Sequence, residues 1–186
     1  MKFGVVTFPG SNCDQDMVYV LKDLMGQEVV ELWHKDTDLQ GADFIVIPGG
    51  FSYGDYLRSG AIAKFSPIME SVIAHANNGG YVMGVCNGFQ ILTESGLLEG
   101  ALLHNDTQKF ICKNVYLKPV SQTAAPTKDL HTDQAYQIPI AHGEGRFYAD
   151  DATMASLQAN DQILFTYCAA DGSQDASTNP NGSLQH

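Results

Sequence analysis

Short apolar runs alternate with amphipathic stretches over the first half of the chain. Four of these runs have the β-branched, aromatic and apolar composition typical of strands. They are residues 2–8, Glu28–Trp33, Phe44–Ile47 and Tyr81–Val85. Between them, residues 12–25 and 61–76 repeat apolar side chains at helical spacing, and a third helix is expected from about Asn87. This order predicts an α/β fold with a doubly wound, mostly parallel sheet and helices on both faces.

The second half of the chain follows a different pattern. Residues 110–120 alternate in part between apolar and polar positions, as a half-buried strand does. Further short strands are expected at Tyr136–Ile140, Gly145–Tyr148 and Ile163–Tyr167. A weak helix is expected at Ala152–Leu157. We therefore predict an antiparallel addition in the C-terminal half.

Length and charge limit the possible classes of protein. A chain of 186 residues fits a single domain over residues 1–186. No apolar run approaches the ~20 residues that cross a bilayer and nothing resembles a signal peptide, so we expect no membrane segment and a cytoplasmic location. Lys and Arg total 10 against 21 Asp and Glu, a formal net charge of −11. Such a surface repels a phosphate backbone, which argues against nucleic acid as a partner.

The main candidate for chemistry is a cysteine between the fourth strand and the third helix. The spacing Gly84-x-Cys86-x-Gly88 is the cysteine counterpart of the Gly-x-Ser-x-Gly nucleophile elbow. Glycines at these positions allow a sharp turn that leaves the thiol at a helix N-terminus, where N–H groups and partial positive charge favour a thiolate. The alternative is a structural cysteine that is buried beside two packing glycines.

A second glycine-rich loop, Pro48–Asp55, follows the strand Phe44–Ile47. Ligands of open parallel sheets bind beyond the carboxyl ends of the strands, so we expect this loop and the elbow to lie together there. A thiolate that attacks a carboxamide needs N–H donors where the oxyanion develops. The N–H of Asn87 and those of the segment Gly49–Phe51 are candidates. Alternatively, the Pro-Gly-Gly sequence is only a favourable turn.

A catalytic cysteine also needs a proton acceptor, which is usually a histidine. The candidates are His34, His75, His104, His131, His142 and His186. His142 is distinctive because Glu144 stands two residues on, between glycines. A solvent-facing turn or a loop that contacts a partner explains the same residues equally well. No set of histidines and cysteines has the spacing of a zinc site, so we expect no metal.

Several long motifs resemble a known family. They are Val5–Asp14, Pro48–Ala61, Gly84–Leu92, Ala141–Phe147 and Asn179–Ser183. Together they resemble the small glutaminase subunits of phosphoribosylformylglycinamidine synthase, which are class I (triad-type) glutamine amidotransferases. The resemblance covers nearly the whole chain.

The resemblance implies hydrolysis of glutamine to glutamate and ammonia through a thioester on Cys86. It places Gly50 and Asn87 near the oxyanion and Gln90 beside the substrate, and Phe51 is a further candidate for the oxyanion or substrate site. The ammonia would pass to a large ATP-dependent synthetase subunit of purine biosynthesis, and a third small subunit would complete the complex. ATP and Mg belong to the large subunit, so no cofactor is expected in this chain.

The sequence departs from the family in its last residues. The family's catalytic histidine and glutamate lie in a Pro-His-Pro-Glu segment downstream of the motif Asn179–Ser183. This sequence stops at His186, before such a segment, whereas His142 and Glu144 match a different, upstream motif. We therefore expect a chain that lacks its C-terminal segment and is an impaired glutaminase.

Two other functions fit parts of the pattern. Proteins similar to DJ-1 and to intracellular proteases also carry a cysteine on a strand-to-helix elbow. That hypothesis predicts a carboxylate close to Cys86 and no glutamine at position 90, where this chain has Gln90. A catalytically incomplete chain could instead be a docking or regulatory partner of the large subunit.

Overall fold

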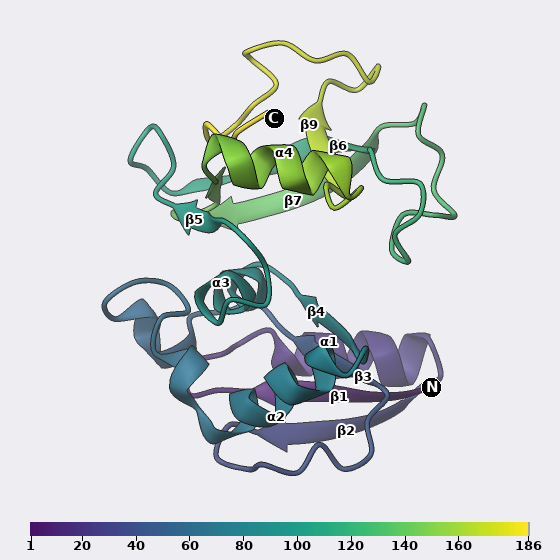
Figure 1. The fold of residues 1–186 in the computed structure, drawn as a ribbon, viewed down its shortest axis with the longest axis vertical. Helices are drawn as coiled ribbons and strands as arrows, with labels where there is room; N and C mark the ends of the chain where they lie inside the picture. The colour runs from purple at the N-terminus through teal and green to yellow at the C-terminus, as the bar shows by residue number, and fades with distance from the viewer. Residues whose placement is uncertain (186) are drawn as a thin grey trace. The chain divides into compact units, whose positions relative to one another are not determined.

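A four-stranded parallel sheet organises the first of the two units into which the chain divides, Met1–Leu98 and Glu99–His186. The computed structural model describes residues 1–185. The strands are β1 (Lys2–Thr7), β2 (Glu28–Trp33), β3 (Phe44–Ile47) and β4 (Tyr81–Gly84), in the order β2-β1-β3-β4 (Figure 1). All three neighbouring pairs are parallel, which confirms the predicted sheet.

Helices cover both faces of this sheet. They are α1 (Asp14–Tyr19) with its π-helical continuation η1 (Val20–Leu24), α2 (Pro67–Asn77) and α3 (Asn87–Glu94). Val5 and Val6 point to opposite faces, because successive side chains of a strand alternate. Val5 packs in a cluster with Leu21 of η1, whereas Val6 belongs to a cluster with Met69 of α2 and Ile91 of α3. The doubly wound arrangement is therefore confirmed.

The second helix begins later than the apolar spacing of residues 61–76 predicts. Ala63–Phe65 form a separate 3₁₀ turn, η3, and α2 starts at Pro67. Ser66 is extended, with φ −65° and ψ 140°. A residue before proline avoids the helical region, and proline itself suits the first helical position. The proline therefore fixes the start of α2.

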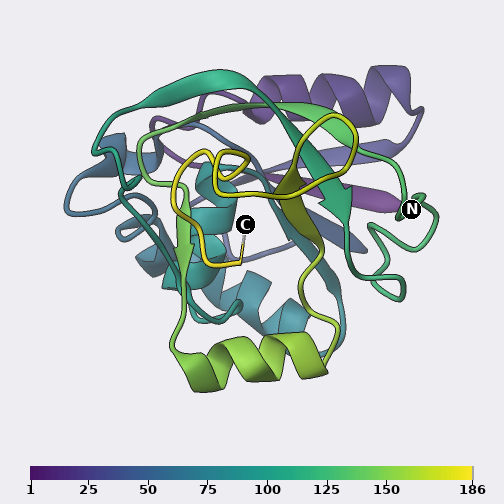
Figure 2. The same ribbon diagram turned by 90° about the horizontal axis from the view of Figure 1, so that it is seen from above.

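The second unit contains antiparallel strands and one helix. A two-stranded sheet pairs β5 (Ala101–Leu103) with β8 (Arg146–Tyr148), and a three-stranded sheet has the order β7 (Tyr136–His142), β6 (Ile111–Pro119), β9 (Phe165–Cys168). Every pairing is antiparallel, as predicted for the C-terminal half (Figure 2). Strand β5 was not predicted from the sequence.

Helix α4 (Asp151–Ala159) supplies the apolar core of the second unit. The carboxylate of Asp150 caps it by accepting a hydrogen bond of 2.8 Å from the N–H of Thr153. Met154 and Leu157 of the helix are buried beside Ala149. The weak helix predicted at 152–157 is therefore confirmed and is slightly longer.

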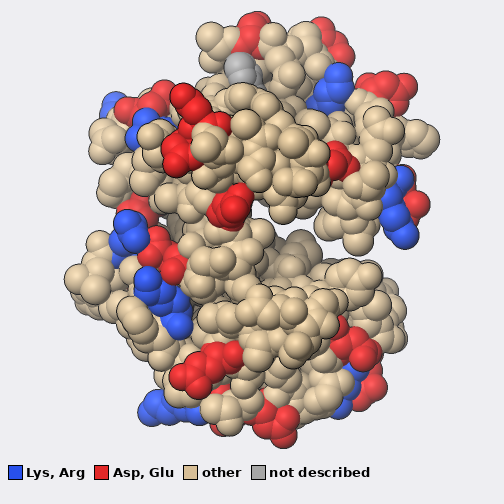
Figure 3. Space-filling model, viewed as in Figure 1, with Lys and Arg blue, Asp and Glu red and all other residues tan. Residues whose placement is uncertain are grey.

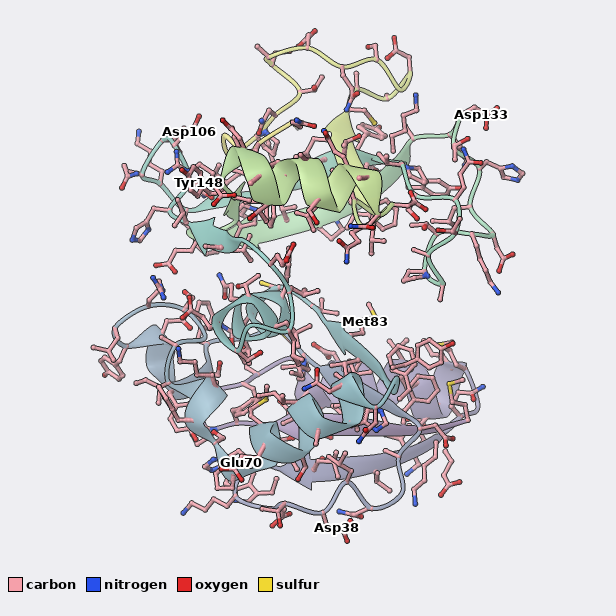
Figure 4. All side chains as sticks on the ribbon, viewed as in Figure 1. Asp38, Glu70, Met83, Asp106, Asp133 and Tyr148 are labelled. Atoms are coloured by element: carbon pink, nitrogen blue, oxygen red, sulfur yellow. The ribbon has the colours of Figure 1, made fainter. Side chains whose placement is uncertain are left out.

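Acidic side chains are scattered over the visible face rather than gathered in one patch (Figure 3). Strand β4 lies at the edge of its sheet and exposes two large side chains, Tyr81 and Met83, the second of which projects from the strand in Figure 4. Among the helices of residues 1–185, none is long and apolar enough to span a bilayer.

Candidate active site

Cys86 stands at the turn between strand β4 and helix α3. The strand ends at Gly84, and the helix begins at Asn87. Cys86 has φ 52° and ψ −108°, a conformation that residues other than glycine rarely adopt. Such strain persists only where the surroundings hold it, and it is typical of functional sites. The structure thus confirms the strand-to-helix elbow that the glycine spacing predicts.

The glycines of the elbow let α3 approach the sheet directly. A Cβ atom at Gly88 would lie 1.9 Å from the carbonyl oxygen of Ile47, at the end of β3. A Cβ atom at Gly84 would lie 2.5 Å from the backbone of Gly88. Neither position has room for a side chain. The first turn of α3, and with it Cys86, is therefore held against the carboxyl ends of β3 and β4.

Loops from the carboxyl ends of β1 and β3 meet beside the elbow. Gly50 forms an isolated antiparallel bridge with Ser11, and a Cβ atom at Gly50 would lie 2.6 Å from the backbone nitrogen of Asn12. A Cβ atom at Gly49 would lie 3.4 Å from the Cβ of Cys86. The predicted convergence of the glycine-rich loops at this edge of the sheet is therefore confirmed.

The two loop donors predicted for the oxyanion differ in their surroundings. The N–H of Phe51 donates a hydrogen bond of 3.2 Å to the carbonyl oxygen of Gly10, and the Phe51 side chain is exposed. This bond engages the Phe51 N–H inside the loop. The N–H of Gly50 is therefore the better candidate for a bound substrate.

The side-chain amide of Asn87 makes several hydrogen bonds that no sequence pattern predicted. Its Oδ1 accepts a hydrogen bond of 3.1 Å from the N–H of Ser52 and another from the Ser52 hydroxyl. Its Nδ2 donates to Oδ1 of Asp55 at 3.2 Å and to Oε1 of Gln90 at 2.8 Å. Ser52 and Asp55 belong to the glycine-rich loop Pro48–Asp55, but their side-chain partner could not be deduced from the spacing of that loop.

Gln90 lies one turn into α3 and is buried, with 7% of its surface exposed. Its side-chain oxygen accepts the bond from Asn87, so it belongs to the same hydrogen-bonded group. Of the predicted site residues, Cys86, Asn87 and Gln90 thus follow one another on the elbow and the first turn of α3. Gly50 and Phe51 come from the loop after β3.

Opposing influences act on the pKa of Cys86. Cys86 as a residue is exposed, but the protein atoms around its sulfur desolvate the thiolate and raise the pKa of the thiol above the ordinary value, and the proximity of Cys13 and of the Asp55 carboxylate raises it further. The N–H of Asn87 donates to the sulfur and lowers the pKa, but by less. The helix N-terminus therefore favours the thiolate through this N–H, as expected, but desolvation outweighs the one bond.

Neither histidine of the first unit is a partner of Cys86. Nδ1 of His34 lies 2.6 Å from the hydroxyl oxygen of Tyr53. His75 lies against Gly80, where a Cβ atom would be 2.2 Å from its Nε2. Within residues 1–185, no histidine is among the groups that shift the pKa of Cys86.

Two histidines of the second unit, His104 and His142, have side-chain partners within that unit. Nδ1 of His142 lies 3.1 Å from Oδ1 of Asn105. Glu144, which the sequence suggested as its carboxylate, instead lies 3.4 Å from Nε2 of His104. The contacts that the structure gives thus join Glu144 to His104 and His142 to Asn105. His186, the last candidate, lies outside the described residues.

A metal site is absent from the part of the chain that the structure covers. Residues 1–185 contain no group of three or more His, Cys, Asp or Glu side chains that could hold a metal ion.

Comparison with known sequences connects this site to glutamine amidotransferases. The profile of the family described as "CobB/CobQ-like glutamine amidotransferase domain" matches residues 1–186. A curated relative from Moorella thermoacetica, phosphoribosylformylglycinamidine synthase subunit PurQ, is 56% identical over 185 residues, which are 99% of this chain and 78% of the relative. The subunit of the same name from Nostoc sp. is 54% identical over 186 residues, 100% of this chain and 80% of the relative.

Solved structures agree with this comparison. The structure of PurLQS from Thermotoga maritima contains a chain that matches with a TM-score of 0.79 and 37% identity, covering 100% of this chain and 86% of that one. The glutaminase domain of CTPS from Trypanosoma brucei, with bound acivicin, matches with a TM-score of 0.54 over 86% of this chain and 72% of its own. Its identity of 13% supports the fold alone.

Proposed function

The chain belongs to the CobB/CobQ-like glutamine amidotransferase domain family, and we propose that it is the glutaminase subunit of phosphoribosylformylglycinamidine synthase, an enzyme of purine biosynthesis. The observation that carries this proposal is the position of Cys86. Its thiol lies on a strained elbow at the start of α3, beside the glycine-rich loop after β3. The family resemblance predicted from the motifs is confirmed by the relatives, and it excludes the alternative of a DJ-1-like protein. The close carboxylate that this alternative predicts is present as Asp55, but Gln90 and the family match decide against it.

In the proposed reaction, the thiolate of Cys86 attacks the side-chain carbonyl carbon of glutamine and forms a C–S bond. The carbonyl oxygen becomes negatively charged, and the N–H groups of Asn87 and Gly50 stabilise it. The C–N bond then breaks, the nitrogen takes up a proton, and ammonia leaves a thioester. Water hydrolyses the thioester to glutamate and restores the thiol. Gln90 is assigned to the substrate side of this site.

The ammonia is assigned to a synthetase subunit. The relatives are named as subunits of the synthase. One chain of the solved PurLQS structure matches the fold of this chain over all of this chain's length. We propose the large ATP-dependent subunit as the acceptor of ammonia and a third small subunit as a further member of the complex. ATP and Mg are used by the large subunit in this scheme, and this chain supplies only the glutaminase site.

The attack also requires a group that accepts the proton of the Cys86 thiol. The raised pKa keeps Cys86 mostly protonated at neutral pH, and neither His34 nor His75 is in a position to act on it. General-base assistance is typically worth ~10²–10⁴ in rate. We propose that residues 1–186 by themselves hydrolyse glutamine slowly.

The proposal is tested by measuring glutamate release from glutamine, with Cys86→Ala as the matched control. We expect slow release that depends on Cys86 and is insensitive to His142→Ala. The same rate is measured for the longer relative from Moorella thermoacetica. Its glutamate release should be faster by about 10²–10⁴ if general-base assistance operates there and not in this chain. Equal rates in the two proteins, with His142→Ala abolishing release here, would show that the base is His142.

A second measurement keeps the test decisive if turnover is too slow to detect. A chloroketone analogue of glutamine should label Cys86 in preference to Cys13, Cys112 and Cys168. Equal labelling of the four cysteines would contradict a glutamine site. If this chain binds the large subunit but the chloroketone shows no preference for Cys86, the alternative of a purely docking or regulatory subunit is favoured.

A further inference from the structure

The carboxamide of Asn87 connects the two parts of the chain that supply the oxyanion donors. Its own backbone N–H is the donor on α3, while Ser52, which binds its side chain, stands two residues after the loop donor Gly50. Asn87 and Ser52 are almost fully enclosed, with 1% and 2% of their surfaces exposed. The distance between the two donors therefore depends on this buried contact.

The orientation of this amide is determined by its partners. The N–H of Ser52 can only donate, so it requires the amide oxygen of Asn87. The carboxylate of Asp55, on the other side, accepts from the NH₂ group. A flipped amide would put its NH₂ against the Ser52 N–H and its oxygen against the Asp55 carboxylate. The side chain is therefore fixed in one orientation.

The backbone around this contact is strained on both sides. Cys86 on the elbow has φ 52°, and in the loop Tyr53 has φ 56° and Asp55 has φ 53°. Conformations of this kind persist only where the surrounding structure holds them. The hydrogen bonds from Ser52 to Asn87 and from Asn87 to Asp55 join the two strained segments to each other.

We infer that Asn87 and Ser52 are positioning residues, whose side chains fix the distance between the Asn87 N–H and the Gly50 N–H in the oxyanion site. This inference rests on the proposed glutaminase function and adds to it a role for side chains that do not touch the substrate. Donors stabilise an oxyanion only when they are held at the place where its charge develops. A small displacement of one donor therefore slows the formation of the tetrahedral species.

The test compares two electrophiles that react with the same thiol. A chloroketone analogue of glutamine has a ketone oxygen that occupies the oxyanion site while the sulfur attacks. Iodoacetamide alkylates by direct displacement and develops no oxyanion. Each reaction forms one C–S bond, releases chloride or iodide, and passes the thiol proton to solvent. The ratio of the two rates at Cys86 therefore reports the oxyanion site and cancels changes in the reactivity of the thiol.

Two variants and a matched control carry the experiment. Ser52→Ala removes the hydroxyl but keeps the N–H bond to Asn87, and Asn87→Asp keeps the size of the side chain but removes its NH₂ group. Ser95→Ala removes a hydroxyl at the other end of α3, where, among residues 1–185, it donates to the carbonyl oxygen of Leu92. We expect the rate ratio to fall about 10- to 100-fold in the two variants and to stay at the wild-type value in the control.

The outcomes separate this inference from the proposed function. A wild-type ratio in both variants would overturn the positioning role while leaving the glutaminase site intact. A wild-type protein without any preference of the chloroketone for Cys86 would instead overturn the proposed function. Should Asn87→Asp fail to fold, Ser52→Ala decides alone, because it preserves the backbone contact.

Discussion

At the scale of single residues, Cys86 combines two opposing influences. The N–H of Asn87 stabilises its thiolate, as expected at the start of a helix, but burial destabilises the charge more strongly. Asp55 and Cys13 act in the same direction as burial. The resting nucleophile is therefore a thiol, and a proton acceptor is needed before it can attack.

The raised pKa has a measurable consequence for alkylation. Only the thiolate reacts with iodoacetamide, so the rate at Cys86 should keep rising with pH through the range in which an ordinary cysteine, with a pKa of about 8.5, has already levelled off. The rate is followed by mass spectrometry of the peptide that contains Cys86, with Cys86→Ser as the blank. A plateau at or below the ordinary cysteine range would show that the helix N-terminus outweighs burial after all.

At the scale of elements, the contact between α3 and the end of β3 depends on the absence of a side chain at Gly88. The parallel sheet and the elbow could both be predicted from the sequence, because apolar runs and glycine spacing are local patterns, whereas the strand order β2-β1-β3-β4 came from the structure. The start of α2 was predicted too early, because apolar spacing continues through residues 61–66 although Pro67 prevents one continuous helix. The hydrogen bonds of Asn87 had no local pattern at all.

Gly88→Ala should destabilise the protein and disturb the site together. The new methyl group would lie 1.9 Å from the carbonyl oxygen of Ile47, so α3 must shift away from β3. Overpacking of this kind typically costs about 1–3 kcal/mol of unfolding free energy. The midpoint of urea unfolding should fall, and labelling of Cys86 by the chloroketone should slow.

Gly143→Ala is the control for this substitution. Its Cβ atom would meet only the ring of Phe110, at 3.9 Å, which is an ordinary contact. The urea midpoint of this variant should stay near that of the wild type. If the two variants lose equal stability, the close approach of α3 to β3 is not the cause.

At the scale of the whole molecule, each unit contains one histidine that burial keeps neutral. Burial is the main cause of the lowered pKa of His34 and of His142. Near His34, the charge of Lys35 lowers the pKa further and that of Asp36 opposes it. The folded protein therefore binds fewer protons than the unfolded chain. The stability from these histidines is complete above the unfolded pKa of about 6.5 and is lost as pH falls below it toward the folded values.

The thermal unfolding midpoint should accordingly decrease as the pH is lowered from about 7.5 to about 5. The double variant His34→Asn and His142→Asn should show a smaller fall, because the amide can replace Nδ1 without titrating. Asp150, Asp161 and Asp171, whose pKa values are lowered by hydrogen bonds, change charge at more acidic pH and do not contribute in this window. An equal fall in the wild type and the double variant would contradict the role of the histidines.

The sequence by itself determined the parallel sheet, the elbow at Cys86 and the family, because each follows from neighbouring residues: apolar runs, glycine spacing and long motifs. The tertiary structure alone decided that Asn87 binds Ser52 and Asp55 and that Glu144 lies beside His104. It also decided the direction of the pKa shift at Cys86. These features depend on which loops meet and how much water they exclude, and such distances between segments are not encoded in any local pattern.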